Sequence, residues 1–241
     1  MNKTILISIG LICVLIAAAG IMYVTYTKST KEAWLDYNLW FEANQKSSAL
    51  EDDGKNEEAI KIYDKILEIY PNKISILYGK SDLLNRMGKY QEALQVLEKI
   101  LQLNTKEDAA WQRKGKILAE LGQFEKALEA LNKSIKYNPD SMSILNKGDI
   151  LIRLNRLDEA IKIFDKLIND NDNDDIYDIF CGDSWYGKAI CYSLKNDKIN
   201  TLTSLSKSVK YKISPFKEYA RENESFKWLW EDEEFKKITQ E

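Results

Sequence analysis

Apolar residues in residues 108–140 recur with the spacing of two α-helices. They fall at steps of three and four in two series, which are Trp111, Gly115 and Leu118, then Phe124, Ala127, Leu128, Leu131 and Ile135. Such steps place side chains on one face of a helix. Gly122 separates the two series, and Asn138-Pro139 follows the second, where proline disfavours a helical conformation in the residue before it. The pattern predicts two short amphipathic helices joined by a tight turn.

The same pattern recurs along the chain at a nearly constant period. Shifted back by 34 residues, its skeleton falls on Leu77, Gly88, Tyr90, Ala93, Leu97 and Ile100. Shifted forward by 33 residues, it falls on Ile144, Gly148, Leu157, Ala160, Phe164 and Leu167. Two short helices with one apolar face each cannot bury both faces alone, whereas copies stacked side by side can. The period therefore predicts an all-α repeat protein.

The repeated unit resembles the tetratricopeptide repeat family. The residues that carry the resemblance in the third unit are Trp111, Gly115, Leu118, Gly122, Phe124, Ala127, Leu131 and Pro139. Gly115 and Ala127 stand where the two helices cross, and larger side chains there would force the helices apart. The resemblance implies an all-α helix-pair solenoid wound into a right-handed superhelix.

Five such units are predicted, followed by a terminal cap. The units cover residues 40–73, 74–107, 108–140, 141–173 and 182–215, and the cap covers residues 216–241. A helical solenoid needs a cap because its last repeat otherwise leaves an apolar face in water. The segment after the last unit is similar to the capping helices of the family. Residues 28–39 are predicted to be a helical linker.

An apolar run near the amino end predicts a single transmembrane helix within residues 1–27. Ile5–Val24 contains 20 residues without a charge, and a helix of that length spans about 30 Å, the thickness of the hydrocarbon core of a bilayer. A cleaved signal peptide is the alternative, with Ala17 and Ala19 at the cleavage site. Continuation of the apolar run past Ala19 favours the anchor.

The flanking charges give a slight preference for orientation. Lys3 precedes the apolar run, whereas Lys28 and Lys31 follow it. A short leader that holds a lysine usually stays on the inner side of the membrane. The sequence therefore slightly favours the repeats on the outer side.

Charge and motif content argue against several functional classes. The net charge of −3 gives no basic field that would recruit nucleic acid. The chain has no histidine and no GxxxxGK[ST] phosphate-binding loop, so histidine-based catalytic sites and P-loop chemistry are excluded. Cys181 and Cys191 are expected to be unpaired thiols. We expect no enzyme activity, no cofactor, no metal and no small-molecule substrate.

An acidic insert stretches the period before the fifth unit. Asn169–Asp175 reads NDNDNDD and spaces carboxylates somewhat like the ligands of a calcium loop. However, Asp175 stands at the position of the turn glycine, and Cys181 stands at that of the bidentate glutamate. These departures favour a solvated loop over a calcium site.

The resemblance implies that the first helix of each pair lines the concave surface of the superhelix, where partners bind. The residues predicted on that surface are Tyr78, Asp82, Arg86, Gln112, Arg113, Lys116, Leu145, Asp149, Arg153 and Tyr186. Tyr78 is predicted to be the main anchor and Lys116 to orient the ligand. The carboxylate clamp of chaperone adaptors is not expected, because only Arg113 matches its positions.

These observations predict a membrane-anchored scaffold that docks a protein or peptide partner along its concave face. A different class of function is also open. The repeats could instead pack against copies of themselves or against a larger envelope assembly, as a structural component without a free-peptide ligand.

Overall fold

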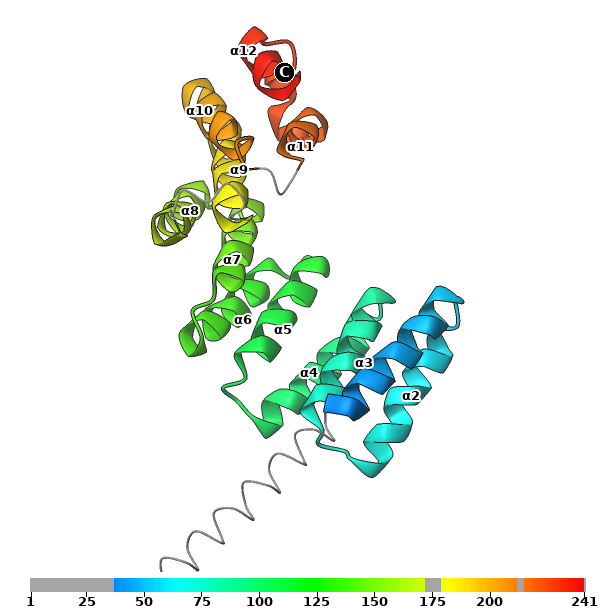
Figure 1. Cartoon of the computed structure of the whole chain (residues 1–241). Coiled ribbons are helices and arrows are strands. Elements are labelled where there is room, and N and C mark those ends of the chain that lie inside the picture. Colours follow the sequence, from blue (N-terminus) through cyan, green and yellow to red (C-terminus); the bar gives the residue numbers. More distant parts are fainter. Residues whose placement is uncertain (1–36, 172–178, 212–214, 241) are drawn as a thin grey trace, which may run out of the picture. The chain divides into compact units, whose positions relative to one another are not determined.

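The computed structural model describes residues 37–171, 179–211 and 215–240 (Figure 1). Over these residues the chain forms helices and turns and no β-strand, which confirms the predicted all-α class. The chain divides into two compact units, Met1–Val96 and Leu97–Glu241, and we describe each by itself. The apolar run Ile5–Val24 and most of the acidic insert lie outside the described residues. Within those residues, no helix is long and apolar enough to cross a membrane.

The first unit contains one complete helix pair and part of a second. A helix over residues 37–52 precedes α2 (Asn56–Ile69), and α3 (Ile74–Arg86) precedes α4 (Tyr90–Leu103), whose residues 90–96 belong to this unit. Tyr63 of α2 is fully buried, and its ring packs on Gly79 of α3. A Cβ atom at Gly79 would lie 2.6 Å from the Tyr63 ring, so the contact requires a glycine.

The second unit continues the alternation of first and second helices. Its elements after residue 103 are α5 (Asp108–Glu120), α6 (Phe124–Tyr137), α7 (Ser141–Arg153), α8 (Leu157–Asn171), α9 (Ile179–Leu194), α10 (Lys198–Ser208), α11 (Phe216–Glu222), the 3-10 helix η1 (Glu224–Leu229) and α12 (Glu233–Gln240). The first helices α5, α7 and α9 contact one another in series, and each also packs on its own second helix. The unit is therefore a stack of helix pairs.

The turn inside each helix pair has one residue in the left-handed region. The five residues and their φ angles are Gly54 (74°), Gly88 (71°), Gly122 (70°), Asn155 (55°) and Asn196 (56°). The next N–H donates back to a carbonyl of the first helix, as from Gln123 to Leu118 at 2.9 Å. Glycine adopts this conformation freely, and asparagine tolerates it better than most residues. This explains the regular glycine spacing in the first three pairs.

Close helix crossings explain the small residues of the repeat. A Cβ atom at Gly115 would lie 2.8 Å from Cγ of Leu131 and 3.2 Å from the carbonyl oxygen of Ala127. The prediction that Gly115 and Ala127 meet where α5 crosses α6 is therefore confirmed. The Phe164 ring of α8 likewise packs closely on two glycines. A Cβ atom at Gly148 would lie 2.5 Å from this ring, and a Cβ atom at Gly187 would lie 2.6 Å from it.

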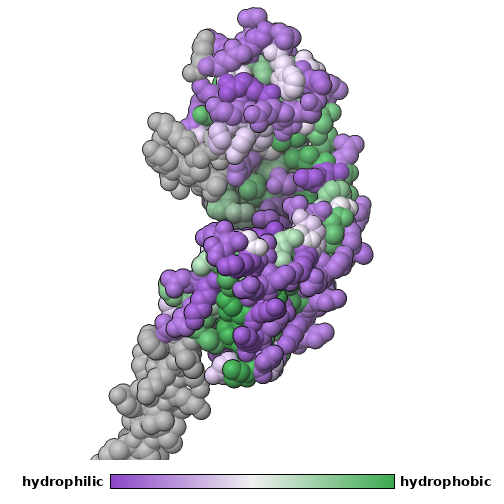
Figure 2. Space-filling model, turned by 90° about the vertical axis from the view of Figure 1, so that its right-hand side faces the viewer, coloured by the Kyte–Doolittle hydropathy of each residue, from purple (hydrophilic) through white to green (hydrophobic). Residues whose placement is uncertain are grey.

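The carboxyl-terminal helices pack on the last helix pair. Phe226, Leu229 and Phe235 are buried together with Ala189 of α9 and Leu205 of α10. Cys181 and Cys191 are both buried, and neither forms a disulfide within the part of the chain that the structure describes, as predicted. Polar residues cover most of the face seen in Figure 2, with hydrophobic residues at the surface between them. This distribution is what amphipathic helices in a stack produce.

Candidate functional site

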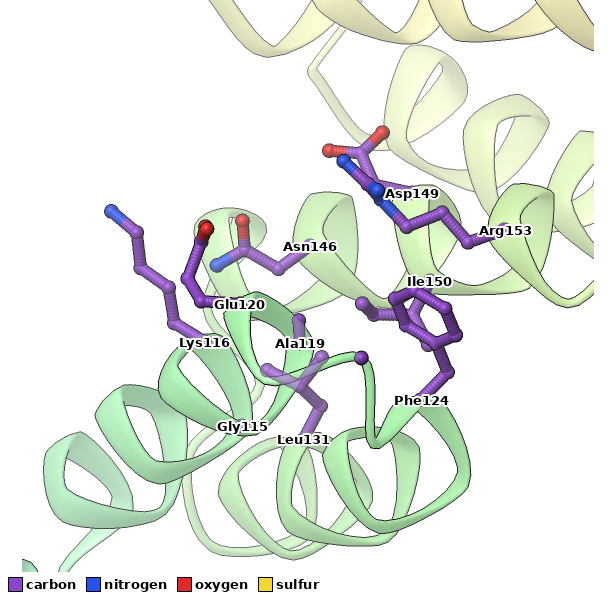
Figure 3. Close-up of a pocket in the computed structure, with 11 residues that line it drawn as sticks. Gly115, Lys116, Ala119, Glu120, Phe124, Leu131, Asn146, Asp149, Ile150 and Arg153 are labelled. Atoms are coloured by element: carbon purple, nitrogen blue, oxygen red, sulfur yellow. The ribbon is translucent and has the colours of Figure 1, made fainter. Parts of the chain in front are cut away.

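Three helices of the second unit enclose a pocket of about 290 Å³ (Figure 3). Its apolar wall includes Ala119 of α5, Leu131 of α6 and Ile150 of α7. Five polar or charged side chains also line it, which are Lys116 and Glu120 of α5 and Asn146, Asp149 and Arg153 of α7. Three of the ten residues predicted to bind a partner, Lys116, Asp149 and Arg153, therefore line one pocket.

Helical spacing brings the α7 side chains to this wall. Asn146, Asp149 and Arg153 follow one another at steps of three and four, so they share one face of α7. Ile144 and Leu151 are buried elsewhere on the helix. Burial of these apolar side chains fixes the rotation of α7 about its axis and turns the polar face towards the pocket.

The side chains of Lys116, Asn146 and Asp149 have no hydrogen-bond or ion-pair partner among the residues that the structure describes. Figure 3 shows the Lys116 ammonium and the Asp149 carboxylate on opposite sides of the pocket. An unpaired cation, an amide and an unpaired anion are thus available to a ligand.

The carboxyl group of Asp149 lies in an unfavourable environment. The Asp149 side chain is exposed to solvent, but the many protein atoms around it still weaken the hydration of the carboxylate. This loss of hydration, followed by repulsion from Asp183 of α9, raises the pKa of Asp149 to about 7, while Arg153 acts in the opposite direction. Partial burial also raises the pKa of Asp183.

Arg153 makes a contact along the pocket wall. Its guanidinium carbon lies 5.7 Å from the centroid of the Phe124 ring, a distance typical of a cation–π contact. The side chain is exposed, and it lies one helical turn from Asp149. Arg153 therefore reduces the negative potential near Asp149 without forming an ion pair within 4.0 Å of it.

The other predicted residues of the second unit make contacts within the protein. The Gln112 amide donates to Asp140 Oδ1 at 3.2 Å and to Ser143 Oγ at 3.0 Å. Arg113 donates to the Ala109 carbonyl at 3.4 Å, and Leu145 is only 7% exposed. These side chains support the fold of α5 and α7.

Tyr186 of α9 lies under the terminal helices. Its ring centroid is 5.5 Å from that of Phe216 and 5.8 Å from that of Phe226. The Asn223 amide donates to its hydroxyl oxygen at 3.4 Å. Tyr186 therefore takes part in the packing of the cap on α9.

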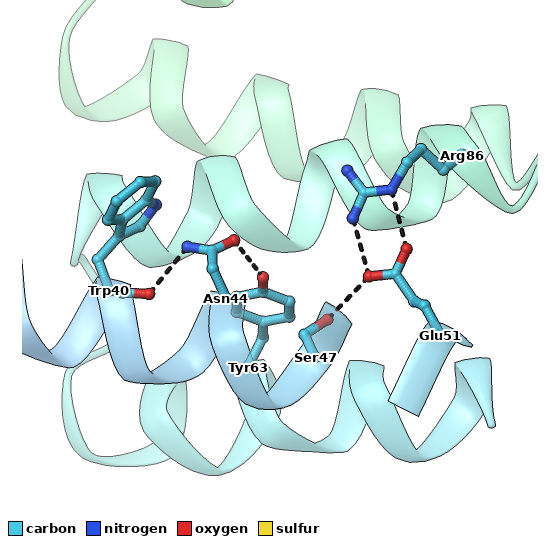
Figure 4. Close-up of polar contacts among 6 residues, drawn as sticks. All are labelled: Trp40, Asn44, Ser47, Glu51, Tyr63 and Arg86. Carbon is cyan, nitrogen blue, oxygen red and sulfur yellow. Dashed lines mark hydrogen bonds and ion pairs between the residues drawn. The ribbon is translucent and has the colours of Figure 1, made fainter. Parts of the chain in front are cut away.

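The first-helix polar side chains of the first unit form a network of their own (Figure 4). Arg86 donates to both carboxylate oxygens of Glu51 at 2.9 Å, and Ser47 donates to Glu51 at 3.1 Å. The Tyr63 hydroxyl donates to Asn44 Oδ1 at 2.7 Å. Tyr78 and Asp82 also interact with neighbouring groups. Arg86 is thus engaged within the unit.

Three contributors to the pocket were missed from the sequence. Asn146 and Glu120 line it, and Asp183 acts on Asp149 from the next first helix. Asn146 and Glu120 could have been found by their spacing, since each lies three or four residues from a predicted site residue on the same helix. Asp183 likewise lies three residues from Tyr186 on α9, but its proximity to Asp149 depends on how α9 packs on α7.

The family comparison agrees with the helix pairs. The family model described as Tetratricopeptide repeat matches residues 50–113, 84–146 and 118–179. Taken together, these matches run from residue 50 to residue 179 and cover more than half of the 241 residues. The comparison with curated proteins found no match.

Several solved structures have the same fold. A tetratricopeptide repeat protein from Parabacteroides merdae matches with a TM-score of 0.61 and 20% identity, over 83% of this chain and 72% of that one. MamA from Desulfovibrio magneticus matches with a TM-score of 0.60 and 19% identity, over 77% and 98%. YrrB, a TPR protein with an unusual peptide-binding site, matches with a TM-score of 0.54 and 23% identity, over 70% and 84%. Identities this low support the fold alone.

Proposed function

The chain belongs to the tetratricopeptide repeat family, and from this premise we propose that it is a membrane-tethered scaffold for protein–protein interaction. A protein or peptide partner docks on the surface formed by the first helices of the second unit. Residues 5–24 hold the chain in the membrane, with the repeats on the outer side. The proposal includes no catalytic step.

The observation that carries the docking proposal is the pocket between α5, α6 and α7. It combines an apolar wall with Lys116, Asn146 and Asp149, whose polar groups have no partner in the described part of the chain. Binding sites typically combine apolar surface with a few polar groups that orient the ligand. The structural neighbour YrrB has a peptide-binding site on the same fold, which supports a peptide as the ligand.

Crosslinking in native membranes tests the docking proposal. The full-length protein is crosslinked in its own membranes, purified under denaturing conditions, and its covalent partners are identified by mass spectrometry. We expect a second protein joined to residues of α5 or α7. Crosslinks only between copies of this chain would contradict docking and favour a self-associating structural component.

Alkaline washing tests the membrane tether. The proposal rests on the 20 uncharged residues from Ile5 to Val24, enough to span the hydrocarbon core as a helix. We expect the full-length protein to remain in the membrane fraction after washing with high salt and with carbonate at alkaline pH. A soluble mature protein whose amino terminus is Gly20 would contradict the tether and favour a cleaved signal peptide.

A further inference from the structure

We propose that Asp149 and Asp183 bind a basic side chain of the partner, an arginine or a lysine, while a neighbouring apolar side chain of the same partner enters the pocket. The inference rests on the proposed docking function and adds the chemistry of the peptide that docks. Asp149 lines the pocket from α7, and Asp183 acts on it from α9, the next first helix of the stack.

The charges around Asp149 favour a cationic ligand. Arg153 of α7 approaches Asp149 from its own helix, and Asp183 of α9 repels it. The Cys191 thiol of α9 also lies near, but burial raises its pKa to about 12, so it carries no charge. On the α5 side, Lys116 and Glu120 have opposite charges. The α7–α9 side thus holds two carboxylates and one guanidinium.

Among the described residues, neither carboxylate has a partner that would exclude a ligand. No described residue forms an ion pair or a hydrogen bond with the side chain of Asp149 or Asp183. Asp183 is half-buried, so its ionised form lacks part of its hydration. A cation between the two groups would relieve their repulsion and supply charge-assisted hydrogen bonds.

An anionic ligand fits this surface less well. The two cations of the pocket, Lys116 and Arg153, come from different helices, and Figure 3 shows them on opposite sides of the pocket. Asp149 stands beside Arg153 and would repel a carboxylate bound there. A phosphate or carboxylate group would therefore meet one cation and at least one anion.

The pocket beside these carboxylates suits an apolar side chain. Leu131, Ile150 and Ala119 provide apolar surface within the same 290 Å³. The Asn146 amide also lines the pocket and can both donate to and accept from a peptide bond. We infer an extended peptide in which a basic residue lies one or two positions from an aliphatic residue.

The protonation of Asp149 adds a pH dependence. Because its pKa is raised to about 7, the unliganded carboxyl is increasingly protonated below neutral pH. Protonation removes the charge that attracts the basic side chain. Binding of the basic peptide should therefore weaken as the pH falls from 8 to 6, and the bound cation should lower the pKa of Asp149.

Selection from a random peptide library tests the inference. The full-length protein is immobilised in detergent and used to select from displayed random 12-residue peptides at pH 8. The wild type is compared with the double variant Asp149→Asn/Asp183→Asn. The matched control is Glu129→Gln on α6, an exposed carboxylate outside the pocket. Thermal unfolding verifies that all three proteins are folded.

We expect the wild type and Glu129→Gln to enrich peptides with arginine or lysine next to an aliphatic residue. Individual selected peptides should bind the double variant about tenfold more weakly, and binding to the wild type should weaken at pH 6. Peptides that bind in the pocket without a basic residue, or acidic peptides, would overturn the inference and leave the docking function intact. Failure of the wild type to select any peptide would overturn the inference, whereas the docking function is overturned only if crosslinking in native membranes also joins no second protein to α5 or α7.

Discussion

First-helix polar side chains are used differently in the two compact units. In the first unit, Arg86 forms a bidentate pair with Glu51, and Asn44 accepts from Tyr63. In the second unit, Lys116 and Asp149 line a pocket and have no partner among the described residues. First-helix polar side chains thus make internal contacts in the first unit, whereas Lys116 and Asp149 of the second unit are open to a ligand.

The difference indicates which substitutions should change stability and which should change binding. A polar group that is paired within the fold stabilises it, and its removal leaves the partner group unsatisfied. An unpaired group at a pocket contributes little to folding, so its loss should be seen mainly in the affinity for a ligand. We therefore expect first-unit substitutions to lower the free energy of unfolding and second-unit pocket substitutions to spare it.

Removal of the Tyr63 side chain should have the largest effect. Tyr63 is fully buried, and its ring fills the space beside Gly79. Tyr63→Ala should lower the free energy of unfolding of the first unit by about 3 to 5 kcal/mol, because it creates a cavity. Tyr63→Phe, which keeps the ring and removes the hydrogen bond to Asn44, should cost only about 1 kcal/mol. Denaturant titration measures the free energy of unfolding of both variants. Equal losses for Tyr63→Ala and Tyr63→Phe would contradict the burial of the ring beside Gly79.

A methyl group at Gly148 should disturb the second unit beneath the pocket. The added Cβ would lie 2.5 Å from the Phe164 ring. Gly148→Ala should therefore destabilise the protein by about 1 to 3 kcal/mol through overpacking. Phe164→Leu removes the clashing atoms, so the double variant should lose less than the sum of the two single changes. If thermal unfolding shows that the losses in stability of the two single variants simply add in the double variant, the residue at position 148 does not contact Phe164.

Asp149→Asn should stabilise the second unit slightly at high pH. The raised pKa of Asp149 means that the folded state binds more protons than the unfolded state between about pH 4 and 7. Ionisation therefore lowers the wild-type stability as the pH rises through this window. Since the carboxylate touches water, we expect a gain of about 1 kcal/mol or less for the variant at pH 8 and none at pH 4. A less stable variant at pH 8 would contradict the description of this site.

The Arg86–Glu51 pair should give the smallest effect. The hydrogen bonds from Arg86 lower the pKa of Glu51, so the pair stabilises the protein above the unfolded pKa of glutamate and ceases to do so as the pH falls through the folded value. Because Arg86 is exposed, Arg86→Met should cost about 0.5 kcal/mol at pH 7 and nothing near pH 3. Lys116→Met is the matched substitution in the second unit. We expect it to leave the free energy of unfolding unchanged at both pH 7 and pH 3. Equal losses for both variants would remove the contrast between the units.

Local patterns in the sequence predicted the helix pairs because their causes are local. Steps of three and four predicted the apolar faces, and the recurring glycine predicted the tight turn that ends a first helix. The structure shows that Gly122 adopts the left-handed conformation in this turn. Asn155 and Asn196 hold the same conformation, although the sequence offered no glycine there. The close crossing at Gly115 and Ala127 followed from the small size of the two residues.

The candidate site was predicted less completely, because it depends on side-chain partners. Helical position placed Lys116, Asp149 and Arg153 on one surface, and they do line one pocket. Position alone could not show that Gln112 bonds to the start of α7 or that the cap covers Tyr186. It also could not bring Asp183 near Asp149, since that contact arises from the packing of α9 on α7. The ligand-binding role of the ten residues stays a prediction.

Site-specific photocrosslinking tests docking on the first helices most directly. A photoreactive phenylalanine analogue replaces Lys116 of α5, which lines the pocket, or Glu129 of α6, which lies outside it. Both positions are exposed, so either analogue can reach a partner that passes close to it. After irradiation of native membranes that hold the full-length protein, we predict a covalent complex with a second protein from position 116 and none from position 129. A complex from position 129 together with none from position 116 would contradict docking on the first helices.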